Sequence, residues 1–215
     1  MKGMNQIHRK LSKVKMVGAL VIVLALFGAA GVAGEEMTDA IYPEFESEVE
    51  QDVMVLIDGK TFSFSSGAGG WSTEIVFSQD GGFSGYFHNS DMGDVGDGYP
   101  GGIRYECRFS GMFLVTDRFD FSTYELWIKT LDFEDAVGTE RIVDGVKVIS
   151  TDAYGIKGDD TFILYSPGSE TAGLPEAFLE WVRMPNGWEE IPDALPFYGL
   201  YNTEEEFGFF ADAKQ

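Results

Sequence analysis

Three aspartates at every third position form the most distinctive chemical pattern of the sequence. They are Asp91, Asp94 and Asp97, with a glycine in each interval. Carboxylates on a flexible loop suit a hard cation such as calcium, which takes about six to eight oxygen ligands. The spacing differs from an EF-hand loop, where ligands alternate and a glutamate comes last. We expect a solvated loop of turn-forming residues and no cofactor, with a calcium site at these three aspartates as the alternative.

Four aromatic residues form a candidate ligand-binding site. They are Trp71, Tyr86, Tyr124 and Trp127, in a chain whose aromatic content is 14%. Large rings could line a pocket for a small apolar ligand or a sugar, because they combine a wide apolar surface with a polar group. The alternative is that these side chains belong to a hydrophobic core.

The histidine content limits the catalytic chemistry open to the chain. His88 is the second of only two histidines, and the first lies at position 8. A zinc site normally takes several His or Cys ligands, and a Ser-His-Asp arrangement would have to use His88. The G-x-S-x-G motif of many hydrolases is also missing from the sequence. We therefore expect no catalytic residues and favour a non-enzymatic protein.

The cysteine and the carboxylates each leave an alternative open. Cys107 is the only cysteine, so no internal disulfide can form, and we expect it to be an inert core residue.

Paired carboxylates could support glycoside hydrolysis. With 36 acidic residues, however, such pairs arise by chance. A hydrolase with acidic residues in a cleft is the enzymatic alternative.

The first residues resemble an export signal. A basic start, Lys2 to Lys15, precedes an apolar run from Met16 to Ala33 and small residues before Glu35. This is the three-part pattern of a secretory signal peptide. The run is also close to the ~17–25 residues that span a bilayer, so an uncleaved anchor is the alternative. We divide the chain into a signal peptide or anchor (1–34), an acidic linker (35–52) and a β-barrel domain (53–215).

The net charge of the chain limits the classes of partner that it can bind. The formal net charge is −21, and loss of the five basic residues of the signal would take it to −26. Such a surface repels nucleic acid and anionic lipid. We expect a secreted or extracytoplasmic protein, with membrane contact only through the N-terminal segment, and with a preference for cations and basic partners.

The candidate residues lie on a predicted meander of strands between positions 70 and 131. Apolar and polar residues alternate over Trp71–Ser78, as in a half-buried strand. An Asp-Gly pair follows at 80–81, which is typical of a hairpin. Alternation resumes at Ile103, with Cys107 and Phe109 on the face opposite Glu106. In the last strand, Trp127 lies on the face opposite Tyr124.

One short pattern occurs twice within this meander. Phe-Ser-Gly-x-Phe is present at 83–87 and again at 109–113. Two copies are too few to indicate a repeat architecture.

The remaining segments predict further strands and one helix. An apolar run, Val53–Ile57, and Thr61–Ser65 suggest another hairpin, and Pro175–Arg183 predicts a helix that lies across or plugs a barrel end. Consecutive strands with short turns pair antiparallel. We therefore predict an all-β fold, an antiparallel up-and-down β-barrel of about 8–10 strands, with one C-terminal helix and an N-terminal signal or anchor helix. A two-layer sandwich is the alternative.

Gly69-Gly70-Trp71 opens the meander, and a strand, an Asp-Gly turn and a returning strand follow it. This opening is similar to the G-x-W that begins the lipocalin barrel, and the segment from Gly69 to Arg183 resembles the lipocalin-like (calycin) domain of exported bacterial proteins. The resemblance implies a cup-shaped barrel with an apolar interior. It implies no particular ligand. Arg183 is the candidate for the family's late arginine, which packs on the tryptophan.

Together these observations predict an exported, lipocalin-like binding module of the cell surface, whose ligand is unknown. The alternatives are the hydrolase above and a structural accessory domain without a pocket. An interior filled by side chains would favour the accessory domain.

Overall fold

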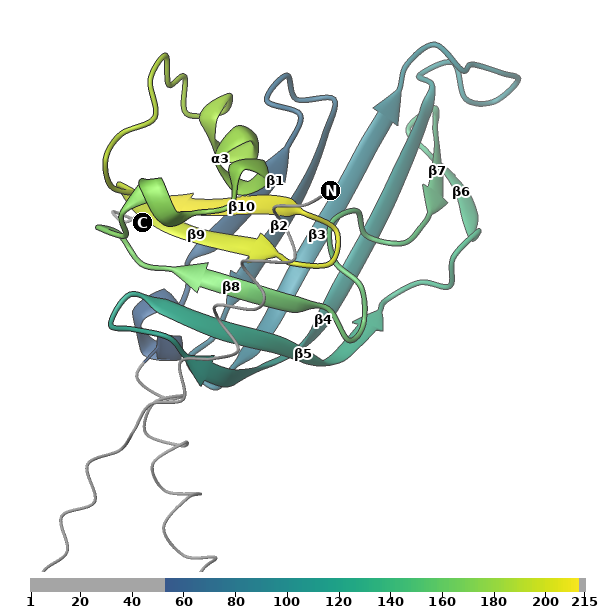
Figure 1. Ribbon diagram of the computed structural model, residues 1–215. Helices are drawn as coiled ribbons and strands as arrows, with labels where there is room; N and C mark the ends of the chain where they lie inside the picture. The colour runs from purple at the N-terminus through teal and green to yellow at the C-terminus, as the bar shows by residue number, and fades with distance from the viewer. Residues whose placement is uncertain (1–52, 213–215) are drawn as a thin grey trace, which may run out of the picture. The chain divides into compact units, whose positions relative to one another are not determined.

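Eight strands form a closed antiparallel barrel in the computed structural model, which describes residues 53–212 (Figure 1). Around the barrel the order is β1-β2-β3-β4-β5-β8-β9-β10, and β10 returns to β1. The strands are β1 (Thr61–Ser65), β2 (Trp71–Phe77), β3 (Gly82–Asp91), β4 (Ile103–Arg118), β5 (Thr123–Phe133), β8 (Thr161–Tyr165), β9 (Phe197–Asn202) and β10 (Phe207–Asp212). The prediction of an antiparallel barrel is confirmed. The predicted signal segment and linker, residues 1–52, lie outside the described residues.

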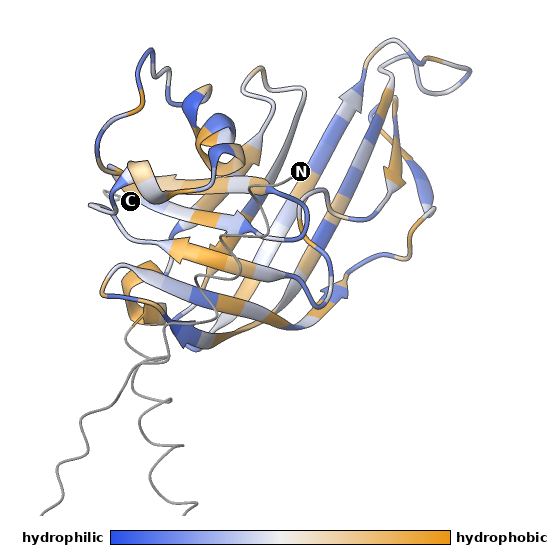
Figure 2. Cartoon of the chain, in the orientation of Figure 1, coloured by the Kyte–Doolittle hydropathy of each residue, from blue (hydrophilic) through white to orange (hydrophobic). Residues whose placement is uncertain are grey.

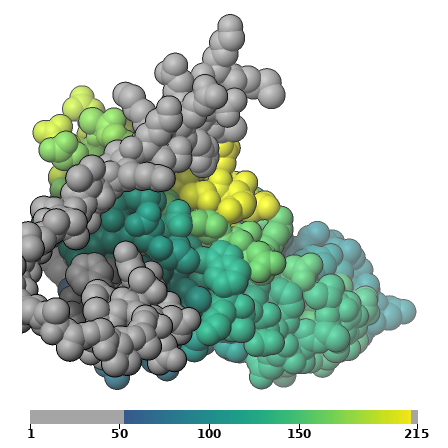
Figure 3. Space-filling model, turned by 60° about the horizontal axis from the view of Figure 1, so that its bottom comes forward, coloured from purple at the N-terminus to yellow at the C-terminus, as the bar shows by residue number. Residues whose placement is uncertain are grey.

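The long strands β3 and β4 extend beyond the barrel and carry a further hairpin. The hairpin consists of β6 (Glu140–Val143) and β7 (Val146–Ser150). The first residues of β4 pair with β7 in parallel, whereas β5 pairs with β4 only from Phe109 onward. Along its first residues, β4 is therefore paired with β7 on the same side on which β5 pairs with it further along the strand. Figure 1 shows this extension projecting from the barrel, and Figure 3 shows the loop between β3 and β4 at its tip.

The predicted alternation places an aromatic core inside the barrel. Along β2, Thr73, Ile75 and Phe77 are buried while Glu74 and Val76 are exposed, and Figure 2 shows similar alternation in colour along β4. Inside, Phe77 stacks on Phe113 with ring centroids 5.2 Å apart. The buried interior phenylalanines are Phe62, Phe64, Phe77, Phe83, Phe87, Phe109, Phe113, Phe162 and Phe209.

A helical turn closes one end of the barrel. Residues 53–57 are helical, and Val53, Met54 and Ile57 are buried in the interior core while Val55 and Leu56 are exposed. The predicted hairpin at this position is therefore wrong. An unbroken apolar run has no period of its own, so sequence alone could not distinguish strand from helix.

The loop between β7 and β8 closes the other end. Its Tyr154 contacts Phe64, Trp71 and Phe207, and its backbone carbonyl accepts a hydrogen bond from the hydroxyl of Thr73. Gly155 follows with φ +94°, and a Cβ there would lie 2.8 Å from the Phe64 ring, so only glycine fits. The interior is thus a packed core with both ends closed.

The C-terminal α-helix covers the outer face of the last three strands. Helix α3 (Glu176–Arg183) follows a short 3-10 helix, η1 (Thr171–Gly173), and packs on β10 (Figure 1). Phe178 lies against the backbone of Gly199 and Gly208. A second core forms here, and its buried members are Tyr165, Phe178, Leu179, Val182, Leu195, Phe197 and Tyr201.

The position of α3 refines the predicted helix. The helix lies on the outer side of the barrel, and its Trp181 reaches the barrel end, where it packs on Phe64 and Trp71. Among residues 53–212, no helix combines the length and apolar character needed to cross a bilayer.

Candidate functional site: a trough on the outer face of β2–β5

Outward side chains on four strands form rows that run across the sheet. In one row Val76, Ser84, Ser110 and Asp132 are successive cross-strand partners on β2, β3, β4 and β5. In the next row Glu74, Tyr86 and Arg108 are partners in the same way. Because directly opposed side chains on one face are only about 5 Å apart, a row of small residues beside a row of large ones leaves a furrow.

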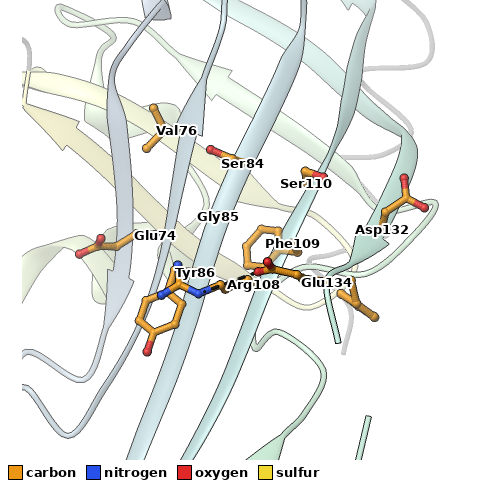
Figure 4. Close-up of a pocket in the computed structure, with 11 residues that line it drawn as sticks. Glu74, Val76, Ser84, Gly85, Tyr86, Arg108, Phe109, Ser110, Asp132 and Glu134 are labelled. Atoms are coloured by element: carbon orange, nitrogen blue, oxygen red, sulfur yellow. Dashed lines mark ion pairs between the residues drawn. The ribbon is translucent and has the colours of Figure 1, made fainter. Parts of the chain in front are cut away.

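This furrow, here called the trough, has a volume of about 500 Å³ (Figure 4). Its lining residues are Glu74, Val76, Ser84, Gly85, Tyr86, Arg108, Phe109, Ser110, Asp132, Phe133 and Glu134. Ser84 and Ser110 lie in the middle of the first row, between Val76 and Asp132. Beneath them, the ring of Phe109 packs against the backbone of β3 at Gly85, where a Cβ would lie 2.2 Å from the ring. A side chain at position 85 would disturb this floor.

Arg108 and Tyr86 form the tall wall of the trough. The Arg108 guanidinium lies 4.7 Å from the centre of the Tyr86 ring, and its Nε is 4.0 Å from a carboxylate oxygen of Glu134. The Tyr86 hydroxyl donates to Glu106 Oε2 at 3.2 Å. Burial, and then the Glu106 carboxylate, raise the pKa of Tyr86. The tyrosine is thus a neutral, fixed side chain at neutral pH.

Glu106 connects the trough wall to the β6–β7 hairpin. Its side chain is only 7% exposed, and its carboxylate forms ion pairs with Arg104, at 3.1 Å, and with Arg141 on β6. Arg141 also pairs with Asp135 at 3.2 Å. Both carboxylate oxygens of Glu106 are therefore occupied by protein groups. This network fixes the hairpin to β4.

His88 lies in the row beyond Tyr86 and forms no catalytic relay. Its Nε2 is 3.4 Å from the Ser72 hydroxyl, and His88 faces Glu106 across the strand pair. The Glu106 oxygens are engaged elsewhere, and His88 Nδ1 is buried without a hydrogen-bond partner among the described residues. A serine–histidine–acid triad needs the histidine to donate to the acid, and that link is missing between these three residues.

The four aromatic residues predicted as a ligand site do not come together. Trp71 lies at one closed end of the barrel against Phe64 and Tyr154. Tyr124 is buried in the interior core, whereas Trp127 is half-buried between Glu125 and Lys129 on the outward face of β5. Of the four, only Tyr86 borders the trough.

The sequence interpretation missed the serines and the charged residues of the trough. The repeated Phe-Ser-Gly-x-Phe pattern could have revealed part of the trough. Its two serines are Ser84 and Ser110, which are direct cross-strand partners. The pairing register that joins them to Asp132 on β5 has no signature in the sequence.

In the candidate calcium site, Asp91 is the last residue of β3, and Asp94 and Asp97 lie on the loop that follows. Asp91 Oδ1 accepts hydrogen bonds from the backbone N–H of Gly93, at 2.9 Å, and of Asp94, at 3.2 Å. Within residues 53–212, no three His, Cys, Asp or Glu side chains are placed to hold a metal ion together. Calcium binding by Asp91, Asp94 and Asp97 stays a prediction, for which the loop provides no preformed ligand set.

Cys107 is buried in the barrel core next to β3. Burial, with the nearby charges of Asp152 and Asp135, raises the pKa of its thiol to about 11. A thiol with so high a pKa carries little thiolate at neutral pH, and the thiolate is the nucleophilic form.

Comparisons with known proteins give no relative from which a function could be inferred, so the function must be argued from this geometry. No family model, no curated protein and no solved structure matches the chain. The resemblance to lipocalins therefore rests on Gly69-Gly70-Trp71 and on the pattern of strands.

Proposed function

We propose that the chain is an extracytoplasmic, non-enzymatic, lipocalin-like module that binds a hydroxyl-rich ligand of the saccharide class in the trough. The observation that carries the proposal is the paired serine row, Ser84 and Ser110, set between the Tyr86–Arg108 wall and Asp132. The export that the first residues predict would bring this surface to the cell exterior.

The lining chemistry favours a sugar over an apolar ligand. Each hydroxyl of a sugar both donates and accepts, and the trough offers serine hydroxyls for both roles, carboxylates as acceptors and the Arg108 guanidinium as a donor. Val76 and the edge of Tyr86 provide apolar surface for the C–H face of a ring. Small-molecule sites commonly measure about 300–1,000 Å³, and the trough is within that range.

The barrel interior offers no comparable site. The nine buried phenylalanines fill it, and the turn at 53–57 and the loop at Tyr154 close its ends. The lipocalin-like assignment is supported by the eight-strand up-and-down closure and by Trp71 at a barrel end. Arg183 does not pack on that tryptophan, because it hydrogen-bonds to backbone carbonyls of Trp188 and Glu189.

The hydrolase alternative is disfavoured by the spacing of the carboxylates. Glu74 is on β2 and Asp132 is on β5, with two strands between them. Three strand spacings amount to roughly 14 Å, whereas glycosidases place their two carboxyl groups about 5–9.5 Å apart. Glu134 is the nearer neighbour of Asp132, and its carboxylate lies 4.0 Å from the Arg108 Nε.

A binding experiment tests the proposal. The mature chain would be titrated with a panel of soluble neutral oligosaccharides and followed by ligand-observed NMR. Ser110→Trp, which fills the trough from an exposed position, should weaken binding at least tenfold. Thr116→Trp, on an exposed part of the same strand outside the trough, should leave binding within twofold. No binding by any oligosaccharide, or equal losses in both variants, would leave the accessory domain as the better description.

A further inference from the structure

A second hollow, separate from the trough, lies beside helix α3. It has a volume of about 620 Å³, and its lining comes from η1, α3 and the segment 191–193. We call it the α3 groove. The lining residues are Glu170, Thr171, Ala172, Leu174, Glu176, Leu179, Glu180, Arg183, Ile191 and Asp193.

Backbone hydrogen bonds hold the side of the groove opposite α3. The amide of Thr171 donates to the carbonyl of Asp193 at 3.0 Å, and the amide of Leu195 donates to the carbonyl of Ser169 at 2.9 Å. Glu170 and Ala194 form an antiparallel bridge between the same two segments. The groove is therefore a preformed feature, and a ligand would not need to order it.

The groove combines apolar side chains with an acidic rim. Leu174, Leu179 and Ile191 provide the apolar part: Ile191 is 41% exposed, Leu174 is half-buried and Leu179 is buried in the outer core. Four exposed carboxylates surround them, and none forms an ion pair with another described residue. These carboxylates belong to Glu170, Glu176, Glu180 and Asp193.

Arg183, the one basic residue of the lining, forms no ion pair with this rim. The Arg183 guanidinium donates to the carbonyl of Trp188 at 3.0 Å and to that of Glu189 at 2.7 Å. It thereby fixes the loop that follows the helix, and it forms no ion pair with the four carboxylates. The rim thus carries unpaired negative charge beside exposed apolar surface.

We infer that the α3 groove is a docking site for a basic, amphipathic segment of a partner protein. Apolar side chains of the segment would cover Ile191 and the accessible part of Leu174, while lysines or arginines would pair with the rim carboxylates. Charge complementarity selects this occupant, because a chain of net charge −21 repels nucleic acid and anionic lipid. This surface is distinct from the trough, so either can act without the other.

Fluorescence polarisation with a defined peptide tests this inference. The probe is a labelled ten-residue peptide of alternating lysine and leucine, titrated with the mature chain at 150 mM salt. The double variant Glu176→Lys/Glu180→Lys should weaken binding at least tenfold. A matched control, Asp117→Lys/Asp152→Lys, makes the same charge change at exposed carboxylates outside both hollows and should change binding less than twofold.

Two further measurements separate docking from general charge attraction. A peptide of alternating lysine and serine should bind at least tenfold more weakly than the lysine–leucine peptide, and Ile191→Ser should weaken binding of the leucine peptide about threefold or more. Equal losses in the two charge variants, or equal binding of the two peptides, would overturn the inference. Absence of binding by both peptides at a protein concentration of 1 mM would overturn it as well.

Discussion

The two sides of the barrel bury their strands to different extents. Strands β8, β9 and β10 have the interior core on one face and α3 with its loops on the other. Strands β2, β3 and β4 have the same core inside, but their outward side chains face solvent or form the trough. The difference shows which strands keep an outer face that α3 and its loops leave uncovered.

The two sides also differ in sequence, as their burial requires. β9 is apolar or small from Phe197 to Tyr201, without alternation, whereas β2 alternates from Trp71 to Phe77. Continuous apolar runs are typical of strands covered on both faces, and alternation is typical of strands with one solvated face. The covered side therefore serves stability, and the uncovered side keeps positions available for binding.

Among the substitutions that test this contrast, loss of the Phe178 ring should have the largest effect on the free energy of unfolding. Phe178 is fully buried in the outer core, and Phe178→Ala should lower the free energy of unfolding by about 3–5 kcal/mol. Val76→Ala, at an outward position of β2 that is 37% exposed, should cost less than about 1 kcal/mol. Urea unfolding monitored by circular dichroism measures both. Similar values for the two variants would contradict the contrast between the sides.

Gly199→Ala should have an intermediate effect. A Cβ at position 199 would lie 2.4 Å from Cζ of Phe178, and such overpacking costs about 1–3 kcal/mol. Gly158→Ala, where nothing lies within 4 Å of the new Cβ, is the matched control and should cost under about 0.5 kcal/mol. In a Phe178→Ala background the cost of Gly199→Ala should largely disappear. If the cost persists there, the ring of Phe178 is not its cause.

The smallest effect concerns a buried carboxylate on the covered side. Asp160 precedes β8, and its Oδ2 accepts hydrogen bonds from Asn202 Nδ2 at 2.7 Å and from the backbone amide of Lys157 at 2.8 Å. Burial raises the pKa of Asp160 despite these bonds. The folded state therefore holds a proton more tightly than the unfolded chain, whose aspartates titrate near about 3.9.

This shift predicts a pH dependence with a definite sign. The stabilisation by protonated Asp160 is complete below the unfolded pKa and is lost as the pH rises through the higher pKa of the folded state. Asp160→Asn keeps a side-chain acceptor but cannot ionise, so its stability relative to the wild type should increase from pH 3.5 to pH 7. Urea midpoints across this range measure the difference. Asp159→Asn, exposed and adjacent, should leave the profile unchanged, and parallel profiles for Asp160→Asn would contradict the shift.

The sequence predicts the alternating side of the barrel better than the covered side. Alternation over Trp71–Ser78 and around Cys107 has one interpretation, a half-buried strand, and the structure confirms it. The helix at Pro175–Arg183 is confirmed as Glu176–Arg183. What Phe178 covers could not be predicted, because its contacts Gly199 and Gly208 come later in the chain and have no side chains to form a pattern.

The trough was beyond prediction for a similar reason. Its residues lie on four strands, and only the pairing register brings Ser84, Ser110 and Asp132 into one row. Two irregularities in the β4–β5 pairing, between Val115 and Asp117 and between Met112 and Phe113, shift this register in opposite directions, so their effects cancel at Ser110, and the periodicity shows neither. The parallel pairing of β7 also escaped prediction, since it joins segments more than 40 residues apart.

The meeting of β1 with β10 has a consequence for how the protein is made. A single Cα pair, Ser63 with Phe210, joins the first barrel strand to the last. During synthesis on the ribosome, or passage through a translocation channel, β1 emerges first and β10 last. The emerging chain therefore keeps two open sheet edges until β10 arrives. Such distant pairing slows folding, and we expect this protein to need protection from aggregation longest in the moments before β10 arrives.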